Sequence, residues 1–341
     1  MSSLSWLTTA GNRIVTVDGT PVVLRGINRS GLEYAPPIGS DFLAGARLSF
    51  SEIEEIVHGW GARVVCIPFA QSRVLETTTS AAYLHALDTV ADWVASCGAY
   101  TLLDLQWLDP DSSYGRTSDG SLNRIAPLPS PDSCDVWRLL AERYQSNPAV
   151  LFDIYNEPHS RLPGDSHVPI GVRPDGSEYS LFDGRVTARV WREVAARLVR
   201  IIKRVHPRAL TFVSGVSWGY DLRGVPFDRD QKIEPAGVVY AAHVYPSSMF
   251  EHGGARAANG SRAWDRAFGA FAADAPVCIT EFGGGEEHVE WGSRLLAYLQ
   301  ARDIGWLAWS WTDAPHLVTG AKPKRPTPFG ALVRSAFDTP T

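Results

Sequence analysis

The sequence has few cysteines, and their arrangement excludes two kinds of site. None of the four belongs to a CxxC pair or to a spacing typical of a metal centre. Cys66 and Cys278 fall inside apolar stretches with strand character, Cys97 lies near the end of a predicted helix, and the fourth is Cys134. We therefore expect free, largely buried thiols and predict neither a metal nor any other cofactor.

Signals for export or membrane insertion are also absent. The N-terminal stretch MSSLSWLTTAGN has no basic region followed by an apolar one, so no secretory signal is predicted. No apolar run approaches the length that spans a bilayer. We expect a soluble chain, cytoplasmic as it is written and secreted if a leader has been removed.

Positive charge is not in excess. Lys and Arg number 32 against 37 Asp and Glu, which gives a net charge of -5 and a pI near 6.0. Nucleic acids and anionic membranes bind basic surfaces, so neither is predicted as a partner, and we expect a monomer. Aromatic residues are plentiful instead, with 12 Trp, 11 Tyr and 13 Phe. They either fill a large core or line a sugar-binding groove.

Short apolar stretches alternate with amphipathic ones along the chain. A hairpin is predicted at about 5–24, with its turn at Asp18-Gly19. Predicted strands follow at 22–28, 63–69, 100–106, 151–157, 210–215, 238–245, 276–282 and 305–311. One helix is predicted to begin at Ser49 or Ser51. Further predicted helices span 80–97, 133–146, 184–205, 262–273, 287–302 and 329–337.

This alternation predicts the fold class. Strands that are apolar throughout and alternate with helices indicate a parallel α/β sheet covered on both faces. The 341 residues suit one large barrel or two medium domains, and eight units without a linker favour a single (β/α)8 TIM barrel over residues 1–341. An open doubly wound sheet is the alternative, but the turn GINRSGLEY lacks the glycine pattern that binds dinucleotides.

Polar and aromatic residues collect at the predicted carboxyl ends of the strands, where barrel enzymes have their active sites. Two of them are glutamates, Glu157 in LFDIYNEPH and Glu281 in PVCITEFGG. Glycoside hydrolysis requires such a pair, because one carboxyl group protonates the leaving oxygen while the other attacks the anomeric carbon or activates water. The other candidates are Asn28, Arg29, Gln106, Trp107, Asn156, Trp218, His243, Tyr245, Trp309 and Trp311, with Tyr34 nearby.

Several of these stretches resemble glycoside hydrolase family 5, the cellulase-like retaining barrels of clan A. The resemblance is carried by LRGIN, LAERYQSNPAVLFDIYNEPH, VVYAAHVYP, ITEFGG and WLAWSW, and it extends from about Trp6 to Phe337. It implies that Glu157 is the general acid/base and Glu281 the nucleophile, about 5–5.5 Å apart as retention requires. Glu157 then needs a raised pKa, which the negative charge of Glu281 would favour.

The resemblance also implies roles for neighbouring residues. Asn156 would hydrogen-bond the sugar 2-hydroxyl, and Trp309 would stack beneath the sugar at the cleavage point. His243 and Tyr245, two residues apart and so on one face of a strand, would orient the acid and the nucleophile. The same spacing places Trp309 and Trp311 on one face, and we expect one of them to line the site and the other to fill the barrel. Trp107, Trp218 and Tyr34 are candidates for sugar subsites.

Two positions depart from the family pattern. The family usually has arginine on its second strand, where this chain has Cys66, and histidine at the end of its third, where this chain has Gln106. Losing a guanidinium would raise the pKa of Glu281 unless another cation, for which Arg29 and Arg73 are candidates, takes its place. Asp104 and Asp153 precede the strand ends and are interpreted as interior polar groups that support the site.

The leading hypothesis is a retaining β-glycosidase, an O-glycosyl hydrolase acting within β-1,4-linked glucans as an endoglucanase. Exo action and a mannanase- or xylanase-like specificity are alternatives within the enzymes. A different class is a carbohydrate-binding barrel without activity, which Cys66 and Gln106 motivate. A metal-dependent hydrolase is disfavoured, since the predicted strand ends offer one clear histidine and no ligand cluster.

Overall fold

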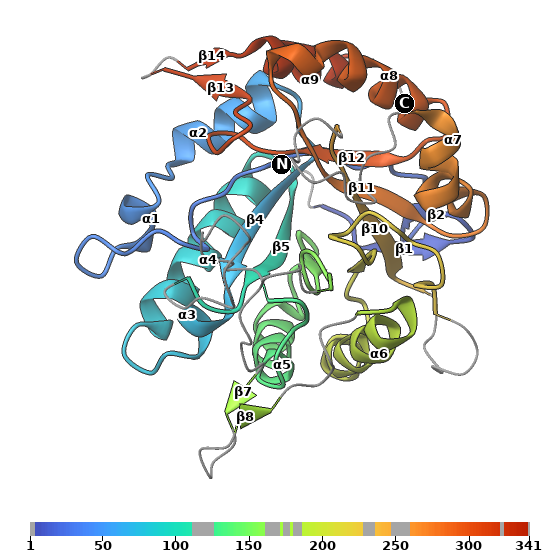
Figure 1. The fold of residues 1–341 in the computed structure, drawn as a ribbon. Coiled ribbons are helices and arrows are strands. Elements are labelled where there is room, and N and C mark those ends of the chain that lie inside the picture. The colour runs from blue at the N-terminus through green and yellow to red at the C-terminus, as the bar shows by residue number, and fades with distance from the viewer. Residues whose placement is uncertain are drawn as a thin grey trace.

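The fold is a closed barrel of eight parallel strands, as predicted (Figure 1). A computed structural model describes residues 4–110, 126–160, 171–172, 178–179, 186–227, 236–246, 260–320 and 324–339. The strands run around the barrel in the order β10-β11-β12-β3-β4-β5-β6-β9. They are β3 Arg25–Asn28, β4 Val64–Ala70, β5 Tyr100–Trp107, β6 Val150–Asp153, β9 Thr211–Ser214, β10 Val238–Val244, β11 Val277–Phe282 and β12 Gly305–Ala308.

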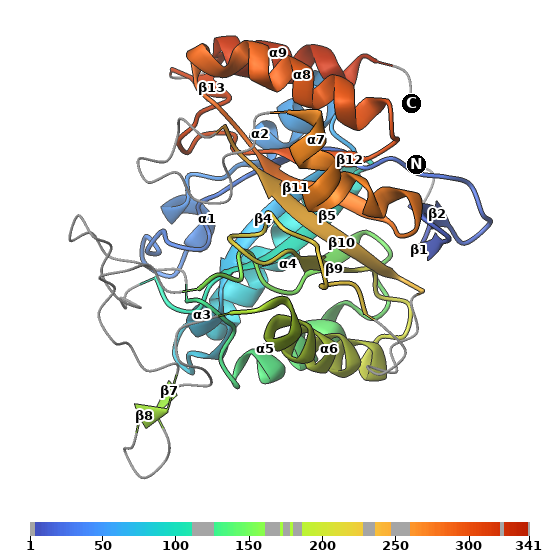
Figure 2. The same ribbon diagram turned by 45° about the vertical axis from the view of Figure 1, so that its right-hand side comes forward.

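Helices surround the barrel, which is seen from two directions in Figures 1 and 2. They are α1 Phe42–Gly45, α2 Phe50–Glu54, α3 Gln71–Leu75, α4 Ser80–Ser96, α5 Ser133–Tyr144, α6 Ala188–Val205, α7 Ser261–Trp264, α8 Val289–Gln300 and α9 Pro328–Phe337. Short π-helical turns extend α2 through Glu55–Gly59 and α7 through Asp265–Gly269, and 3-10 turns cover Phe271–Ala273 and Glu286–His288. None of the helices among these described residues is long and apolar enough to cross a membrane.

The predicted end of α4 is confirmed, whereas the start of α6 and the capping of α2 differ from the prediction. The α4 helix ends at Ser96, and Gly98 follows its C-cap residue at φ +83°, the left-handed conformation that glycine commonly adopts just after a helix. The α6 helix begins at Ala188 rather than 184, where the Thr187 side chain accepts a hydrogen bond from the Val190 N–H. Ser49 occupies the N-cap position of α2, but its hydroxyl contacts Ser51 and makes no capping bond.

The N-terminal hairpin differs from the prediction in its turn. Strands β1 (Leu7–Ala10) and β2 (Arg13–Thr16) pair with each other, so the hairpin turns at 11–12 instead of at Asp18-Gly19. The chain turns again at Asp18-Gly19, and after this turn Pro21 forms one isolated bridge with Val15. Proline has no N–H to donate, which limits pairing on that arm. Two further pairs, β7 Gly171–Val172 with β8 Glu178–Tyr179 and β13 Val318–Thr319 with β14 Arg325–Pro326, are short.

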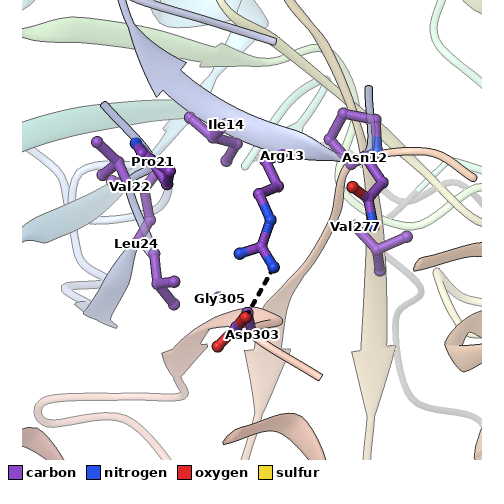
Figure 3. Close-up of a pocket in the computed structure, with 11 residues that line it drawn as sticks. Asn12, Arg13, Ile14, Pro21, Val22, Leu24, Val277, Asp303 and Gly305 are labelled. Carbon is purple, nitrogen blue, oxygen red and sulfur yellow. Dashed lines mark ion pairs between the residues drawn. The ribbon is translucent and has the colours of Figure 1, made fainter. Parts of the chain in front are cut away.

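A pocket lies between this hairpin and the amino-terminal ends of the barrel strands (Figure 3). Leu24, Val277 and Gly305 line it from the barrel, and the ion pair between Arg13 and Asp303, 3.0 Å long, spans it. This end of a barrel is opposite the carboxyl ends of the strands, so the pocket belongs to the closure of the fold and not to a substrate site.

The barrel interior changes character along its axis. Its lower part is apolar and includes Leu24, Val64, Cys66, Leu102, Leu151, Phe212, Ala241, Cys278 and Leu307. Side chains of alternate residues share one face of a strand. Further along the same inward faces, toward the carboxyl ends of the strands, these side chains are buried and polar, and they include Asn28, Asp104, Asp153, Ser214 and His243. Thus the sequence alternation places a buried polar layer directly below the carboxyl ends of the strands.

A buried ion-pair network closes the barrel wall next to β3. Arg29 donates through Nε to Glu52 Oε2 at 2.8 Å, and Trp311 Nε1 donates to Glu52 Oε1 at 2.8 Å. Lys324 also contacts Glu52. Burial alone would raise the pKa of Glu52, but Arg29 and Lys324 hold it below its usual range. The network joins α2 to the segments after β3 and β12.

We predict that Glu52→Gln destabilises the protein by about 3 kcal/mol, because it leaves the buried Arg29 guanidinium without its counter-ion. Thermal unfolding should show a clearly lower Tm. Because the pKa of Glu52 is depressed, its contribution is present above the carboxyl group's unfolded pKa and is lost as the pH falls. The control is Glu290→Gln, which removes an exposed pair with Arg294 and should leave Tm nearly unchanged. Equal effects of the two substitutions would contradict the prediction.

Candidate active site

Two buried carboxyl groups meet at the carboxyl end of the barrel. Glu281 lies within β11, and Glu157 lies four residues beyond the end of β6, with exposed fractions of 8% and 6%. Each has an oxygen within 4.8 Å of the other's and of a nitrogen of His243. The two acids predicted from separate motifs are therefore together, at a separation close to that of a retaining pair.

His243 lies between the two acids. Its Nδ1 is 3.1 Å from Glu157 Oε1 and 3.7 Å from Glu281 Oε2, and its Nε2 is 3.1 Å from Thr280 Oγ1. Burial lowers the pKa of His243, but Glu281 and Glu157 outweigh it, and the net shift is upward. A Cβ built on Gly219 would lie 2.7 Å from the imidazole, so only glycine allows this close packing.

An irregularity of β11 lets consecutive residues reach the same imidazole. Thr280 and Glu281 would point to opposite faces of a regular strand. The register with β10 shifts between Ala242 and His243, which places His243 beside Glu281, and the register with β12 shifts between Ile279 and Phe282. Bulges next to active sites commonly redirect a side chain in this way.

Polar residues on both sides hold the Glu281 segment. Tyr245 donates its hydroxyl hydrogen bond to Glu281 Oε1. Asn28 Nδ2 donates to the backbone carbonyl of Thr280 at 3.0 Å and to that of Ala308 at 3.3 Å. Asn28 therefore binds the backbone of β11 and β12, whereas Tyr245 acts on the carboxylate itself.

Two predicted site residues have buried groups that lack a hydrogen-bond partner among the residues that the structure describes. They are Nδ2 of Asn156 and Oε1 of Gln106, on side chains exposed by 2% and 5%. Buried polar atoms are ordinarily paired, so both atoms are suited to receive a group from a ligand or from water. Asn156 offers a donor and Gln106 an acceptor, and a sugar hydroxyl can both accept and donate a hydrogen bond.

Three further buried carboxyl groups lie near the acids: Asp104 and Asp153 in the polar layer, and Glu33 after β3, which acts electrostatically on Asp104. Burial raises the pKa of Glu33 to about 8 and that of Asp153 to about 7. Burial also raises the pKa of Asp104 well above its ordinary value, with a further contribution from Asp153. Burial likewise raises the pKa of the Cys66 thiol, with Asp104 adding to the shift. Cys66 is thus a neutral thiol in an acidic surrounding.

Arg29 does not fill the role of the missing guanidinium. Its donors are directed at Glu52 and at the backbone carbonyls of Ser30, Ala46 and Arg47. The expectation that Arg29 supplies charge to Glu281 is therefore corrected, because the nearer carboxylate of Glu52 holds it. The other candidate, Arg73, lies over the Phe42 ring at 5.7 Å. His243 is the group that provides a positive charge between the acids when it is protonated.

Partly exposed aromatic rings lie beyond the carboxyl ends of other barrel strands, at the same end of the barrel as the two acids. Tyr34 and Trp107 have ring centroids 5.8 Å apart, and the Tyr34 hydroxyl donates to Asp313 Oδ1 at 2.9 Å. Trp309 is half-buried, with Nε1 donating to the Ala314 carbonyl at 3.1 Å. Trp311 does not share its setting, since β12 ends at Ala308 and Trp311 packs in the outer core against Trp60. The prediction that Trp309 and Trp311 share one face of a strand was therefore wrong.

Trp218 stacks on a histidine that the motifs did not single out. The rings of His159 and Trp218 are 3.5 Å apart and nearly parallel, at 9°. His159 is fully buried, and its Nδ1 lies 2.7 Å from the backbone oxygen of Glu157. Ser217 and Trp218 both have positive φ, at 57° and 63°, a conformation that non-glycine residues rarely adopt. The stack ties the Glu157 loop to the loop after β9.

Sequence reasoning also missed Glu33, Thr280 and Glu52. Glu33 follows a predicted strand end by five residues, so only its burial reveals it. Thr280 stands on the wrong face of β11 by simple alternation, and only the bulge brings it to His243. Glu52 lies in a helix with exposed polar neighbours, and no local pattern marks it as buried.

Among the described residues, Glu157, His243 and Glu281 are the one group of three or more His, Cys, Asp or Glu side chains near enough to share a metal ion. Their facing atoms are engaged with one another, and Tyr245 and Thr280 bind two of the three side chains. A carboxyl pair bridged by an imidazole in this way is suited to proton transfer and nucleophilic attack.

Comparison with known families agrees with this chemistry. Residues 15–315 match the model of the family described as Cellulase (glycosyl hydrolase family 5). The chain belongs to this family. The resemblance predicted from the motifs is thereby confirmed, and Glu157 and Glu281 both lie within the matched region.

The relatives are distant in sequence, and a solved structure shares the fold. The chain is 29% identical over 197 residues to an endoglucanase of Paenibacillus polymyxa, covering 51% of this chain and 45% of the relative. It is 26% identical over 336 residues to the major extracellular endoglucanase of Xanthomonas campestris, covering 88% and 63%. The chain thus spans about half to two-thirds of the length of these relatives. A β-glucanase structure from Saccharophagus degradans with cellotetraose superimposes with a TM-score of 0.70 at 19% identity, over 99% of this chain and 94% of the other.

We predict that Tyr245→Phe lowers kcat by about 10- to 100-fold, because a hydrogen bond to a charged group contributes about 1.5–3 kcal/mol. The measurement is the release of reducing sugar from carboxymethyl cellulose. Tyr144→Phe is the matched control, since its hydroxyl binds Asp88 between the helices α5 and α4, outside the barrel. A kcat for Tyr245→Phe within twofold of the control would show that this hydroxyl does not serve the reaction.

Proposed function

We propose that the protein is a retaining endo-β-1,4-glucanase with Glu157 as general acid/base and Glu281 as nucleophile. The observation that carries this proposal is the approach of two buried carboxyl groups to within 4.8 Å, with His243 between them. Retaining glycosidases have carboxyl groups about 5–5.5 Å apart, whereas inverting enzymes leave about 6.5–9.5 Å for a water molecule. The separation favours direct attack by a carboxylate.

In the first step, Glu157 gives its proton to the glycosidic oxygen while Glu281 attacks the anomeric carbon. The carbon–oxygen bond to the leaving sugar breaks, and an ester bond to Glu281 forms. Tyr245 donates to Oε1 of Glu281, and Oε2 lies on the side of His243. Nδ2 of Asn156 is placed to bind a sugar hydroxyl as charge develops on the ring.

In the second step, Glu157 acts as a base and takes a proton from water, which attacks the anomeric carbon and releases Glu281. The configuration is retained because the sugar carbon is inverted twice. His243 contacts both acids, so their protonation states are electrostatically coupled, and a change of protonation at Glu157 changes the pKa of Glu281.

The substrate is proposed from the relatives and from the aromatic rings. The two relatives described above are endoglucanases, and the similar Saccharophagus degradans structure is a complex with cellotetraose. Tyr34, Trp107, Trp218 and Trp309 are partly exposed, and aromatic faces of this kind stack on sugar rings. Exo action and a mannan or xylan specificity remain the alternatives within the enzymes.

We predict that Glu281→Ala abolishes hydrolysis and that azide restores part of it with an activated aryl cellobioside, giving an α-glycosyl azide. The small anion occupies the space of the lost carboxylate and attacks in its place. Glu287→Ala is the control, because Glu287 is nearby in sequence and 72% exposed. Product configuration is read by NMR, and undiminished hydrolysis by Glu281→Ala would refute the assignment of the nucleophile. Release of no aryl group by the wild-type protein would favour a binding barrel without activity.

Endo action makes a separate prediction. The viscosity of a carboxymethyl cellulose solution should fall steeply while few reducing ends have appeared, because internal cuts shorten chains quickly. Chromatography of early products should show a mixture of oligosaccharides. Early accumulation of a single short product with little loss of viscosity would indicate exo action instead.

A further inference from the structure

The backbone holds the two proposed catalytic carboxyl groups in different ways. Glu281 is inside β11, where it is the register partner of His243 on β10. Glu157 lies four residues beyond the end of β6, and the N–H of Asn156 just before it donates to the Leu105 carbonyl of β5 at 3.2 Å. The next residue is a proline, which has no N–H to donate. The direction of the Glu157 side chain therefore depends on more than the sheet.

His159 provides a contact to the backbone of Glu157. Its imidazole is fully buried, and its Nδ1 lies 2.7 Å from the Glu157 carbonyl oxygen. A carbonyl oxygen accepts, so Nδ1 is the donor of this hydrogen bond. The carbonyl belongs to the planar peptide group that directly follows the Cα of Glu157, so the hydrogen bond fixes that plane. The backbone of His159 is fixed in turn, because its N–H donates to the Pro127 carbonyl at 3.1 Å.

Trp218, on the loop after β9, holds the imidazole of His159 in its plane. The two rings are 3.5 Å apart and nearly parallel, at 9°. The N–H of Trp218 also donates to the Pro158 carbonyl at 3.0 Å. The peptide groups on both sides of Pro158 are therefore bound, one by the His159 side chain and the other by the Trp218 backbone.

The same loop packs on His243. Two isolated bridges close it into a hairpin over 215–221. The Gly219 carbonyl accepts from the His243 N–H at 3.1 Å, and a Cβ on Gly219 would lie 2.7 Å from the imidazole. This hairpin therefore contacts His243 directly and reaches the Glu157 segment through Trp218. Its two contacts hold both partners of the 3.1 Å pair between His243 Nδ1 and Glu157 Oε1.

The backbone of the hairpin is strained where it makes these contacts. Ser217, Trp218 and Gly219 have φ of 57°, 63° and 76°. Residues other than glycine rarely adopt this conformation, and it persists only where surrounding contacts determine it. Here it brings the indole onto His159 and Gly219 onto His243. Strain of this kind is concentrated at sites whose geometry serves a function.

We propose that His159 is a positioning residue that directs the carboxyl group of Glu157 toward the glycosidic oxygen, with Trp218 holding its imidazole in place. The proposal rests on the proposed role of Glu157 as general acid/base. A general acid must lie within hydrogen-bond reach of the atom that it protonates, and a displacement of about 1 Å can cost on the order of 100-fold in rate. Losing the His159 hydrogen bond should therefore weaken proton transfer by Glu157 and leave attack by Glu281 intact.

The test compares His159→Phe with His159→Asn, because each variant keeps one of the two contacts. Phenylalanine keeps a flat ring against Trp218 but has no N–H, whereas asparagine keeps an N–H near the position of Nδ1 without the ring. His159→Leu also lacks the donor and is read in the same way if the phenylalanine variant does not fold.

His206→Phe is the matched control. His206 is also a buried histidine among aromatic rings, with ring centroids 5.4 Å from Trp6 and 6.1 Å from Phe152. It lies between α6 and the amino-terminal end of β9, at the opposite end of the barrel from the two acids. Its replacement therefore reports the general cost of changing a buried imidazole to a phenyl ring.

Two substrates separate proton delivery from general damage. A cello-oligosaccharide needs protonation of its leaving oxygen, whereas the leaving group of a dinitrophenyl cellobioside departs without it. The ratio of the two kcat/KM values does not depend on the fraction of enzyme that is folded. His159→Phe should lower this ratio by about 10- to 100-fold, and His159→Asn, which keeps the donor, by several-fold less. His206→Phe should change the ratio by less than about twofold.

The dinitrophenyl substrate gives a second signature by itself. With so good a leaving group, hydrolysis of the glycosyl-enzyme is expected to limit kcat, and that step needs Glu157 as the base. His159→Phe should therefore lower kcat and KM together and leave kcat/KM within about twofold of the wild-type value. A structural defect would instead lower kcat/KM with both substrates.

Glu157→Ala keeps the proposal apart from the proposed function. It should show both signatures in a stronger form, and if it does not, Glu157 is not the acid/base and the proposed function fails. If Glu157→Ala shows them while His159→Phe leaves the ratio unchanged, His159 does not position the acid. A loss with His159→Asn as large as that with His159→Phe would also overturn the proposal, because the ring would then matter and the hydrogen bond would not. An equal loss with His206→Phe would do the same.

Discussion

The burial of two carboxyl groups within 4.8 Å of each other is the constraint on which the rest of this structure depends. Two negative charges at that distance repel by on the order of 3–4 kcal/mol at an effective dielectric constant of about 20. A proton or a cation must therefore lie between them. His243 occupies that place, with its Nδ1 facing both acids. Its position in turn requires the glycine at 219, the register shift of β10 and the hydroxyl of Thr280, so distant parts of the barrel are shaped by one electrostatic requirement.

The same requirement explains why the distribution of arginine matters in this chain. Arg29 is adjacent to the strand end, but Glu52 and three backbone carbonyls hold its guanidinium in the barrel wall. There it serves stability, joining α2 to the segments after β3 and β12 through Trp311 and Lys324. With a thiol at position 66, the interior carboxyl groups are stabilised in their neutral forms, as the raised pKa values of Asp153 and Asp104 indicate. Charge in the site then depends on protons rather than on a fixed cation.

Much of the architecture could be predicted from the sequence because it rests on repeated local patterns. The eight barrel strands were each located to within a few residues, since buried parallel strands are apolar throughout and are separated by amphipathic helices. The approach of Glu157 to Glu281 followed from the barrel, because the carboxyl ends of all its strands meet at one rim. The hairpin turn and the start of α6 were misplaced, since neighbouring turns and frayed helix ends differ little in local energy.

What could not be predicted depends on departures from regular geometry. Alternation places Thr280 opposite Glu281 and places Trp309 with Trp311, and both inferences fail because β11 is irregular and β12 ends at Ala308. The stack of His159 on Trp218 likewise needs positive φ at two consecutive residues, which no sequence pattern announces. Such strained conformations persist only where surrounding contacts determine them. They occur here around Glu157 and Glu281, because bringing both acids to one imidazole demands directions that a regular strand cannot supply.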